Sequence, residues 1–373
     1  MAIQAGLVGL PNVGKSTLFN ALTKSEIPAE NFPFCTINPH VAITAVSDKR
    51  LDKLAHIFGS KKKLPTTMQF VDIAGLVSGA SKGEGLGNKF LSHVMEVDLI
   101  IHVLRCFKDP NITHVAGTID PVGDFEVIVS ELMLKDLDSL EKRETKVRAQ
   151  IKKFQNSPKE RLEFEQELEL IKEAKTCLDQ GDQQAARKII ANAKDEKIHF
   201  IKLLSTKKFL IAANLSDEDF AGQNFEANDH FKALVEKFGI EHVIPVSAKV
   251  EAELSQMSDE DATEMRKDFE FNHCGLSKVI SKTYAELGLI TFFTCGPKEA
   301  HAWSIPKGFT APEAAGEIHS DLQRGFICVE VYNAQEMFEA GSEQNLKNSG
   351  KIRTEGKEYV IQDGDLLNVR FNV

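Results

Sequence analysis

A phosphate-binding loop near the start of the sequence constrains the fold most. Residues 9–16 read Gly-Leu-Pro-Asn-Val-Gly-Lys-Ser and match the P-loop pattern G-x-x-x-x-G-K-[ST] at every fixed position. The apolar run 3–8 predicts a strand before the loop, and the spacing of residues 15–22 predicts a helix after it. This is the context that the motif requires. The loop therefore predicts a site for a nucleoside triphosphate with Mg²⁺.

Each residue type in the loop has a physical role. Glycines let backbone N–H groups turn onto phosphate oxygens, and the helix N-terminus favours an anion. Lys15 is expected to reach the β- and γ-phosphates and to act in catalysis, while Ser16 offers its hydroxyl to Mg²⁺. The residues of this loop that we expect to bind the nucleotide are Asn12, Val13, Gly14, Lys15, Ser16 and Thr17.

The rest of residues 1–285 predicts an α/β fold. Further apolar runs, each followed by polar or small residues, occur at 68–73, 99–104, 209–213 and 243–246. Strands that alternate with helices and loops indicate a mostly parallel sheet with helices on both faces. We therefore expect a P-loop NTPase domain over residues 1–285.

A helical insertion interrupts this domain. Apolar residues recur at helical spacing from Leu137 to Phe154, and again from Phe164 to Leu178. Asn-Ser-Pro at 156–158 separates the two stripes. The pattern favours an antiparallel, coiled-coil-like hairpin within residues 129–204, packed as an insertion rather than forming a long dimeric coiled coil.

The C-terminal part has a third texture. Short apolar runs at 291–294, 302–305, 326–331, 359–361 and 366–373 predict strands punctuated by glycines, and residues 311–319 predict one helix. This indicates a small α+β domain over residues 286–373.

Two further segments can complete the metal site. Asp72 ends an apolar strand and begins Asp-Ile-Ala-Gly, so its carboxylate can hold Mg²⁺. Gly75 is expected to act in catalysis by offering an N–H to the γ-phosphate. Thr36 lies between the two motifs and could add a hydroxyl when the γ-phosphate is present. We expect Ser16, Thr36 and Asp72 as metal ligands, and the glycine-rich run 78–87 as a second switch segment.

The base-reading segment departs from the GTPase pattern. GTP-binding proteins of this fold read guanine with Asn-Lys-x-Asp, whereas residues 214–217 here read Asn-Leu-Ser-Asp. Residues 247–249, Ser-Ala-Lys, stand where a second base-contacting loop is expected. The expected base-binding residues are Asn214, Leu215, Asp217, Ser247, Ala248 and Lys249.

Composition limits the class of protein. The formal net charge of −10 argues against non-specific coating of nucleic acid. No stretch approaches the roughly 20 apolar residues that span a bilayer. The N-terminus does not read as a signal peptide, and the six cysteines are scattered, so we expect free thiols and a cytoplasmic location. The run Lys61-Lys62-Lys63 is expected to be a solvated loop.

The motifs together resemble the YchF family, an Obg-related branch of the translation-factor GTPases whose members prefer ATP. The matching stretches cover almost the whole chain: 9–22, 31–36, 64–90, 102–107, 126–138 and 291–373. The final domain is similar to the TGS domain of that family, and the hairpin matches its coiled-coil insertion. The resemblance implies slow, partner-stimulated ATP hydrolysis and a role in translation and stress responses. It also implies binding to the ribosome, through the large subunit or the whole particle, with rRNA or tRNA as further partners. We expect a monomer.

One departure from the family concerns the base. The family has Asn-x-x-Glu at the base-reading segment. Asp217 instead matches the aspartate of the GTPase pattern, while the lysine of that pattern is absent. The missing lysine argues against guanine. ATP is the expected nucleotide, with GTP as the alternative.

The catalytic group is less constrained. Leu76 occupies the position where Ras-like enzymes place the glutamine that orients water. The resemblance places a histidine near the switches, which makes His114 a catalytic candidate beside a purely structural role. GTPases with this loop sequence often bind K⁺ through the asparagine, so Asn12 either holds K⁺ or only shapes the loop. Two alternatives to a ribosomal ATPase remain: a binding module with incidental hydrolysis, and a P-loop kinase.

Overall fold

The computed structural model describes residues 3–24, 40–74, 86–191, 203–221, 225–268 and 275–372. The chain divides into two compact units. The P-loop unit comprises Ile3–Ala21 and Phe70–Asn272. The C-terminal unit comprises Met1–Ala2, Leu22–Gln69 and His273–Val373. The expected Thr36, Gly75 and Leu76, and residues 78–85 of the expected second switch, lie outside the described residues.

A parallel sheet forms the centre of the P-loop unit. Its strands β1 (Gln4–Val8), β5 (Leu99–Arg105), β6 (Lys208–Asn214) and β7 (Val243–Val246) pair in that order, all in parallel. On the other side of β1 lies β4 (Thr67–Asp72), which starts in the C-terminal unit beside β2 (Val41–Ala45). All seven residues of β5 are buried, as expected for a parallel sheet covered on both faces. The predicted parallel sheet is confirmed.

Helices follow most of these strands. They are α1 (Lys15–Lys24), α3 (Leu86–Glu96), α7 (Asp217–Ala221), α8 (Asp229–Phe238), α9 (Ala248–Leu254) and α10 (Asp259–Asp268), with a 3₁₀ turn at Phe225–Ala227. An apolar core lies between β6 and α8. Ile211 and Ala213 of the strand pack there with Phe231 and Leu234 of the helix. This packing fixes where β6 and β7 end, and hence where the loops after them begin.

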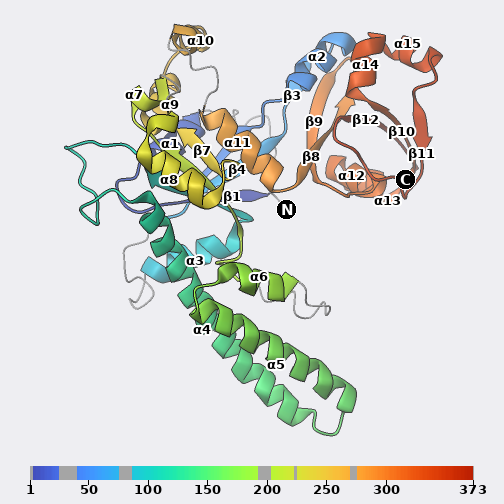
Figure 1. The fold of residues 1–373 in the computed structure, drawn as a ribbon. Coiled ribbons are helices and arrows are strands. Elements are labelled where there is room, and N and C mark those ends of the chain that lie inside the picture. The colour runs from blue at the N-terminus through green and yellow to red at the C-terminus, as the bar shows by residue number, and fades with distance from the viewer. Residues whose placement is uncertain are drawn as a thin grey trace. The chain divides into compact units, whose positions relative to one another are not determined.

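The helices α4 (Pro121–Lys153) and α5 (Pro158–Asp179) form the antiparallel hairpin that the sequence predicts (Figure 1). Asp120 caps α4 by accepting a backbone hydrogen bond from its first turn. Pro158 begins α5 at a position where a missing N–H breaks no helical hydrogen bond. α6 (Gln183–Ala191) follows and packs on α5.

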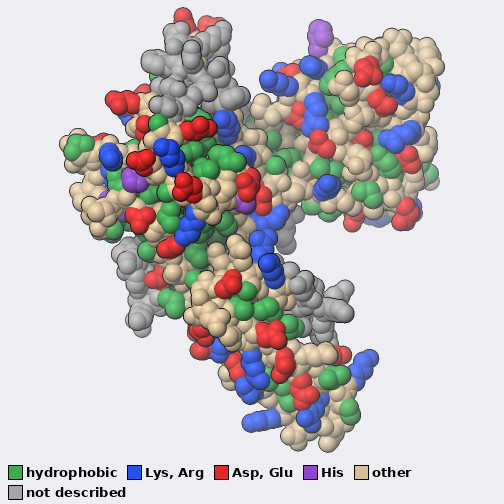
Figure 2. Space-filling view, in the orientation of Figure 1, with side chains coloured by type: hydrophobic (Ala, Val, Ile, Leu, Met, Phe, Trp, Pro, Cys, Tyr) green, Lys and Arg blue, Asp and Glu red, His purple; other side chains and the backbone are tan. Residues whose placement is uncertain are grey.

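The hairpin has its own apolar seam. Its buried residues are Leu140, Val147, Ile171, Ala174 and Leu178, joined by Ala186 and Leu203. Ion pairs cross beside the seam, with 2.6 Å between Arg143 Nε and Glu167 Oε1 and 3.0 Å between Lys175 Nζ and Glu144 Oε2. Basic and acidic side chains alternate over the hairpin surface (Figure 2), so its outer face carries mixed charge.

A second sheet forms the C-terminal unit. Its strand order is β11–β10–β12–β8–β9–β3. The strands are β3 (Lys62–Leu64), β8 (Leu289–Cys295), β9 (Glu299–Pro306), β10 (Phe326–Asn333), β11 (Arg353–Glu355) and β12 (Asp365–Phe371). The helices of this unit are α2 (Lys49–Phe58), α11 (Gly275–Glu286), α12 (Ala311–Ile318), α13 (Ser320–Arg324), α14 (Ala334–Ala340) and α15 (Glu343–Asn348).

This sheet is covered on both faces. Successive strand residues point to opposite faces, so the neighbours Phe292 and Phe293 enter different cores. Phe293 packs with α2 and α14, while Phe292 packs with α12. Figure 1 shows α12 and α14 beside these strands.

Two expectations about the C-terminal region are wrong. The run Lys61–Lys63 is not simply a solvated loop, because β3 pairs in parallel with β9 at the sheet edge, where exposed lysines discourage further strand pairing. Residues 359–361 form no strand, and Val360 makes only an isolated bridge to Thr310. The units also divide the chain differently from the expected boundary at residue 286, because α2 and β3 fold with the C-terminal strands. The predicted domain limits remain a prediction.

Among the described residues, none of the helices has the length and apolarity that crossing a bilayer requires.

Candidate functional site

The phosphate loop connects β1 to α1 and lines a cavity of about 460 Å³. The lining comes from residues 9–12 and 14–17, so the exposed side chains of Asn12, Ser16 and Thr17 border the same space. Val13 differs from its neighbours, because its side chain is buried and its backbone carbonyl accepts a hydrogen bond from Asn214. The sequence motif therefore forms a real concavity at the carboxyl end of β1, where ligands bind in open α/β sheets.

Lys15 and Asp72 meet at this edge of the sheet. β4 and β1 are neighbours, and Ile73 N–H donates to Leu7 carbonyl at 3.2 Å, which sets the end of β4 beside the loop. The Lys15 ammonium donates to the Asp72 carboxylate in a largely buried ion pair. Two expected residues from different motifs are thus brought into contact.

Asn214 joins the phosphate loop to the loop after β7. Its amide NH₂ donates to Val13 carbonyl at 2.9 Å, and its amide oxygen accepts from Ala248 N–H at 2.9 Å. Asn214 is buried, and a side chain at Gly14 would collide with it. Gly14 also has φ of +94°, which favours glycine. Asn214 therefore acts here as a clamp between two loops.

The remaining base-site residues separate into two groups. Asp217 accepts from Lys249 Nζ and from Ser247 Oγ, the latter at 3.2 Å, so these three side chains lie together. The hydrogen bond and charge of Asp217 raise the pKa of Lys249. Leu215 lies apart from them, because its side chain is buried in the core with Phe231. A contact between Leu215 and a bound base stays a prediction that this conformation does not support.

His114 is buried, with both ring nitrogens engaged. Its Nδ1 accepts from Ala116 N–H at 3.2 Å, which assigns the ring proton to Nε2, 3.0 Å from Asp124 Oδ2. Burial raises the pKa of Asp124. The neighbouring Thr113 carbonyl accepts from the Asn12 side chain at 3.2 Å. The loop that carries Thr113 and His114 therefore contacts both the phosphate loop and the first turn of α4. His114 itself does not line the phosphate cavity.

Arg105 organises the same loop and was missed by sequence reasoning. Its guanidinium is buried and donates to three backbone carbonyls, those of Phe107, Asp109 and Ile112, at 3.1, 3.3 and 3.0 Å. It also lies 4.5 Å from the Phe107 ring centroid. The available signal was an arginine at the end of an apolar strand, where a charge needs buried partners.

Taken together, the fold and site define a P-loop NTPase of the GTPase type. Residues 4–135 match a family model described as a 50S ribosome-binding GTPase, and residues 289–372 match the model YchF-GTPase_C, described as a protein of unknown function. The chain belongs to the YchF family, as the following relatives show. It is 44% identical to the ribosome-binding ATPase YchF of Bacillus subtilis and to that of Escherichia coli O157:H7, covering 100% of each chain. The solved structure of the Schizosaccharomyces pombe YchF GTPase is 36% identical with a TM-score of 0.85, covering 99% of this chain and 97% of that one.

Proposed function

We propose that this protein is an ATPase that acts on the ribosome. The observation that carries the proposal is the meeting of Lys15 and Asp72 beside a complete phosphate loop. The names of the two relatives above, ribosome-binding ATPase, support both the nucleotide and the partner. A cytoplasmic location follows from the same partner.

The residues at the sheet edge suit Mg²⁺. Ser16 and Asp72 supply hydroxyl and carboxylate oxygens, the ligand types that this ion prefers, and Thr36 would add another. Bound with the nucleotide, the ion neutralises charge on the β- and γ-phosphates. Lys15 is held by Asp72 in this structure. Phosphate oxygens would compete for the ammonium, and the carboxylate would then be available to the metal.

The base site favours adenine over guanine. Guanine recognition needs a free carboxylate to accept from N1 and N2, but Asp217 already accepts from Lys249 and Ser247. No lysine stands at position 215 to pack on the base. We therefore infer ATP as the nucleotide, with GTP as the alternative.

ATP is expected to bind more tightly than GTP in titrations with Mg²⁺, and Asp217→Glu is expected to keep that order. Lys249→Ala is expected to raise the affinity for GTP, because it leaves the Asp217 carboxylate without its cation. Competition titrations against a fluorescent ATP analogue measure both. GTP binding to the unchanged protein at least about tenfold tighter than ATP, about 1.4 kcal/mol, would show the assignment to be wrong.

Hydrolysis is expected to be slow for the protein alone and faster with ribosomes. Leu76 cannot orient water, and His114 would first have to leave Asp124 to do so. Single-turnover ATP hydrolysis with and without purified ribosomes tests this, and co-sedimentation measures binding. Binding without acceleration would favour a nucleotide-dependent binding module instead.

The same assay in potassium and sodium buffers tests a role for K⁺. Asn12 borders the phosphate cavity with an exposed amide side chain, which supports a cation site there. Its amide also contacts Thr113, which supports a purely structural role. Equal rates in the two buffers would leave only the structural role.

A further inference from the structure

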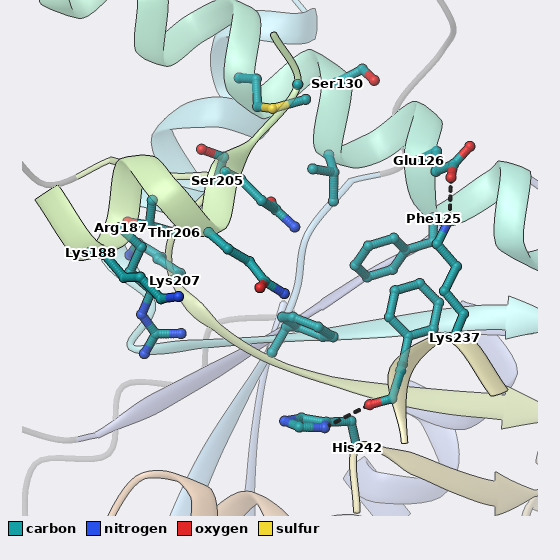
Figure 3. A pocket seen from close by; sticks show the side chains of 17 residues that line it. Phe125, Glu126, Ser130, Arg187, Lys188, Ser205, Thr206, Lys207, Lys237 and His242 are labelled. Carbon is teal, nitrogen blue, oxygen red and sulfur yellow. Dashed lines mark hydrogen bonds and ion pairs between the residues drawn. The ribbon is translucent and has the colours of Figure 1, made fainter. Parts of the chain in front are cut away.

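A second cavity, of about 810 Å³, lies where the helical hairpin joins the sheet of the P-loop unit. Its walls come from α4, α6 and α8, from residues 205–207, and from the first residues of β6 (Figure 3). Phe209 in this wall precedes Asn214, the clamp of the phosphate loop, by five residues of the same strand. At about 3.3 Å per residue the separation is roughly 17 Å, so this is a different site.

One wall of the cavity is aromatic. The rings of Phe125 and Phe238 lie 4.5 Å apart, and Phe209 stacks on His242 with centroids 5.6 Å apart. His242 Nδ1 donates to the Phe238 carbonyl at 2.9 Å, which fixes the imidazole ring against the wall. Phe125 is buried behind this wall, whereas Phe209, Phe238 and His242 are partly exposed and offer ring surfaces on which another flat ring can stack.

The opposite wall is cationic. Figure 3 shows Arg187, Lys188 and Lys207 together, across the cavity from Phe125 and His242. The Lys207 ammonium is held by the carbonyls of Met95 and Val97, which keeps its charge in place. Arg187 and Lys188 are exposed, and neither forms an ion pair with any residue that the structure describes.

The charge balance of the lining selects an anion. Among the residues that the structure describes, the lining has four cationic side chains, Arg187, Lys188, Lys207 and Lys237, and one carboxylate, Glu126, which is paired with Lys237. This local excess stands out in a chain whose formal net charge is −10. An anionic occupant can form ion pairs with the exposed Arg187 and Lys188, whereas a neutral or basic occupant cannot.

We propose that this cavity binds an unstacked nucleotide, with the base on the aromatic wall and the phosphate on Arg187 and Lys188. Stacking on aromatic rings combined with phosphate contacts from arginine and lysine is how proteins hold single-stranded nucleic acid. The nucleotide comes either from single-stranded RNA or from a free mononucleotide. The site goes beyond the proposed ATPase and does not depend on hydrolysis at the phosphate loop.

Charge reversal tests the site. The double variant Arg187→Glu with Lys188→Glu is compared with Lys232→Glu with Lys347→Glu, which makes the same charge change at exposed lysines outside the cavity. The probe is fluorescein-labelled hexauridylate, followed by anisotropy with excess ATP and Mg²⁺ to occupy the phosphate loop. Binding is expected to weaken about tenfold or more in the first pair and less than about twofold in the control pair, since each lost phosphate contact is charge-assisted.

Salt dependence and a third variant provide further readouts. Each phosphate contact contributes a slope of about −0.7 to log K against log salt, so the cavity variant should lose about two such contacts. His242→Ala is expected to weaken binding by roughly fivefold or more through lost stacking. Competition by uridine monophosphate would identify a free nucleotide as the ligand, and failure to compete would identify RNA.

Equal affinity of the cavity double variant and the control double variant for hexauridylate would overturn the proposal. Absence of saturable binding of both hexauridylate and uridine monophosphate to the unchanged protein would also overturn it. ATP hydrolysis is expected to be unchanged in the cavity variants. A failure of the proposed ATPase therefore remains distinguishable from a failure of this site.

Discussion

Replacing Lys15 with alanine is expected to slow single-turnover ATP hydrolysis by about 100-fold or more, the scale on which one group that stabilises developing charge acts. Lys15 is the buried cation of the phosphate loop, and the structure places it on Asp72, at the edge where the metal is expected. Its loss removes a positive charge from the β- and γ-phosphates and leaves the carboxylate unpaired. The measurement is hydrolysis at saturating ATP with Mg²⁺, with a nucleotide titration beside it.

Lys24→Ala provides the matched control for Lys15. Lys24 ends the same helix, is exposed, and lies outside the phosphate cavity. Thermal unfolding without nucleotide separates a catalytic loss from the instability of an unpaired Asp72. Hydrolysis by Lys15→Ala at the rate of Lys24→Ala would contradict the assignment of the loop as the reaction site.

Arg105→Met is expected to lower the free energy of unfolding by roughly 3 kcal/mol or more. Methionine keeps much of the apolar stem, but three backbone carbonyls lose a charged donor, and each such hydrogen bond contributes about 1.5–3 kcal/mol. Urea unfolding measures the change. Because the same loop carries Thr113, the variant should also weaken the contact between Thr113 carbonyl and Asn12.

The control for Arg105 is Arg148→Met, which removes an exposed ion pair with Glu144 one helical turn away. Pairs of this kind contribute less than about 1 kcal/mol. Equal losses in the two variants would mean that the carbonyl network of Arg105 adds nothing beyond a surface ion pair.

The sequence predicts the parts of the site that local chemistry specifies. The phosphate loop depends on glycines and a helix N-terminus within one short segment, and Asp72 follows directly from the strand that carries it. The hairpin is predictable for the same reason, because its apolar period is visible in each helix separately. None of these features requires knowledge of a distant partner.

The features that were missed depend on distant partners. The pairing of β3 with β9 places Lys62 opposite Glu299, and no local sequence signal near Lys62 predicts this pairing. The contact of His114 with Asp124 depends on how the loop folds back onto the first turns of α4. The packing of Leu215 in the core beside α8 also depends on a distant helix, and its expected contact with the base stays a prediction.

The C-terminal sheet is built from separate stretches of the chain, and this affects how the protein folds during its synthesis. α2 and β3 leave the translating ribosome before the strands on which they pack, and the whole segment Phe70–Asn272 is made in between. Until β8 and β9 emerge, Leu51 and Leu54 lack their partners Phe293 and Ala302. The order of synthesis thus differs from the order of packing. The apolar face of α2 stays uncovered until the C-terminal strands have been synthesised.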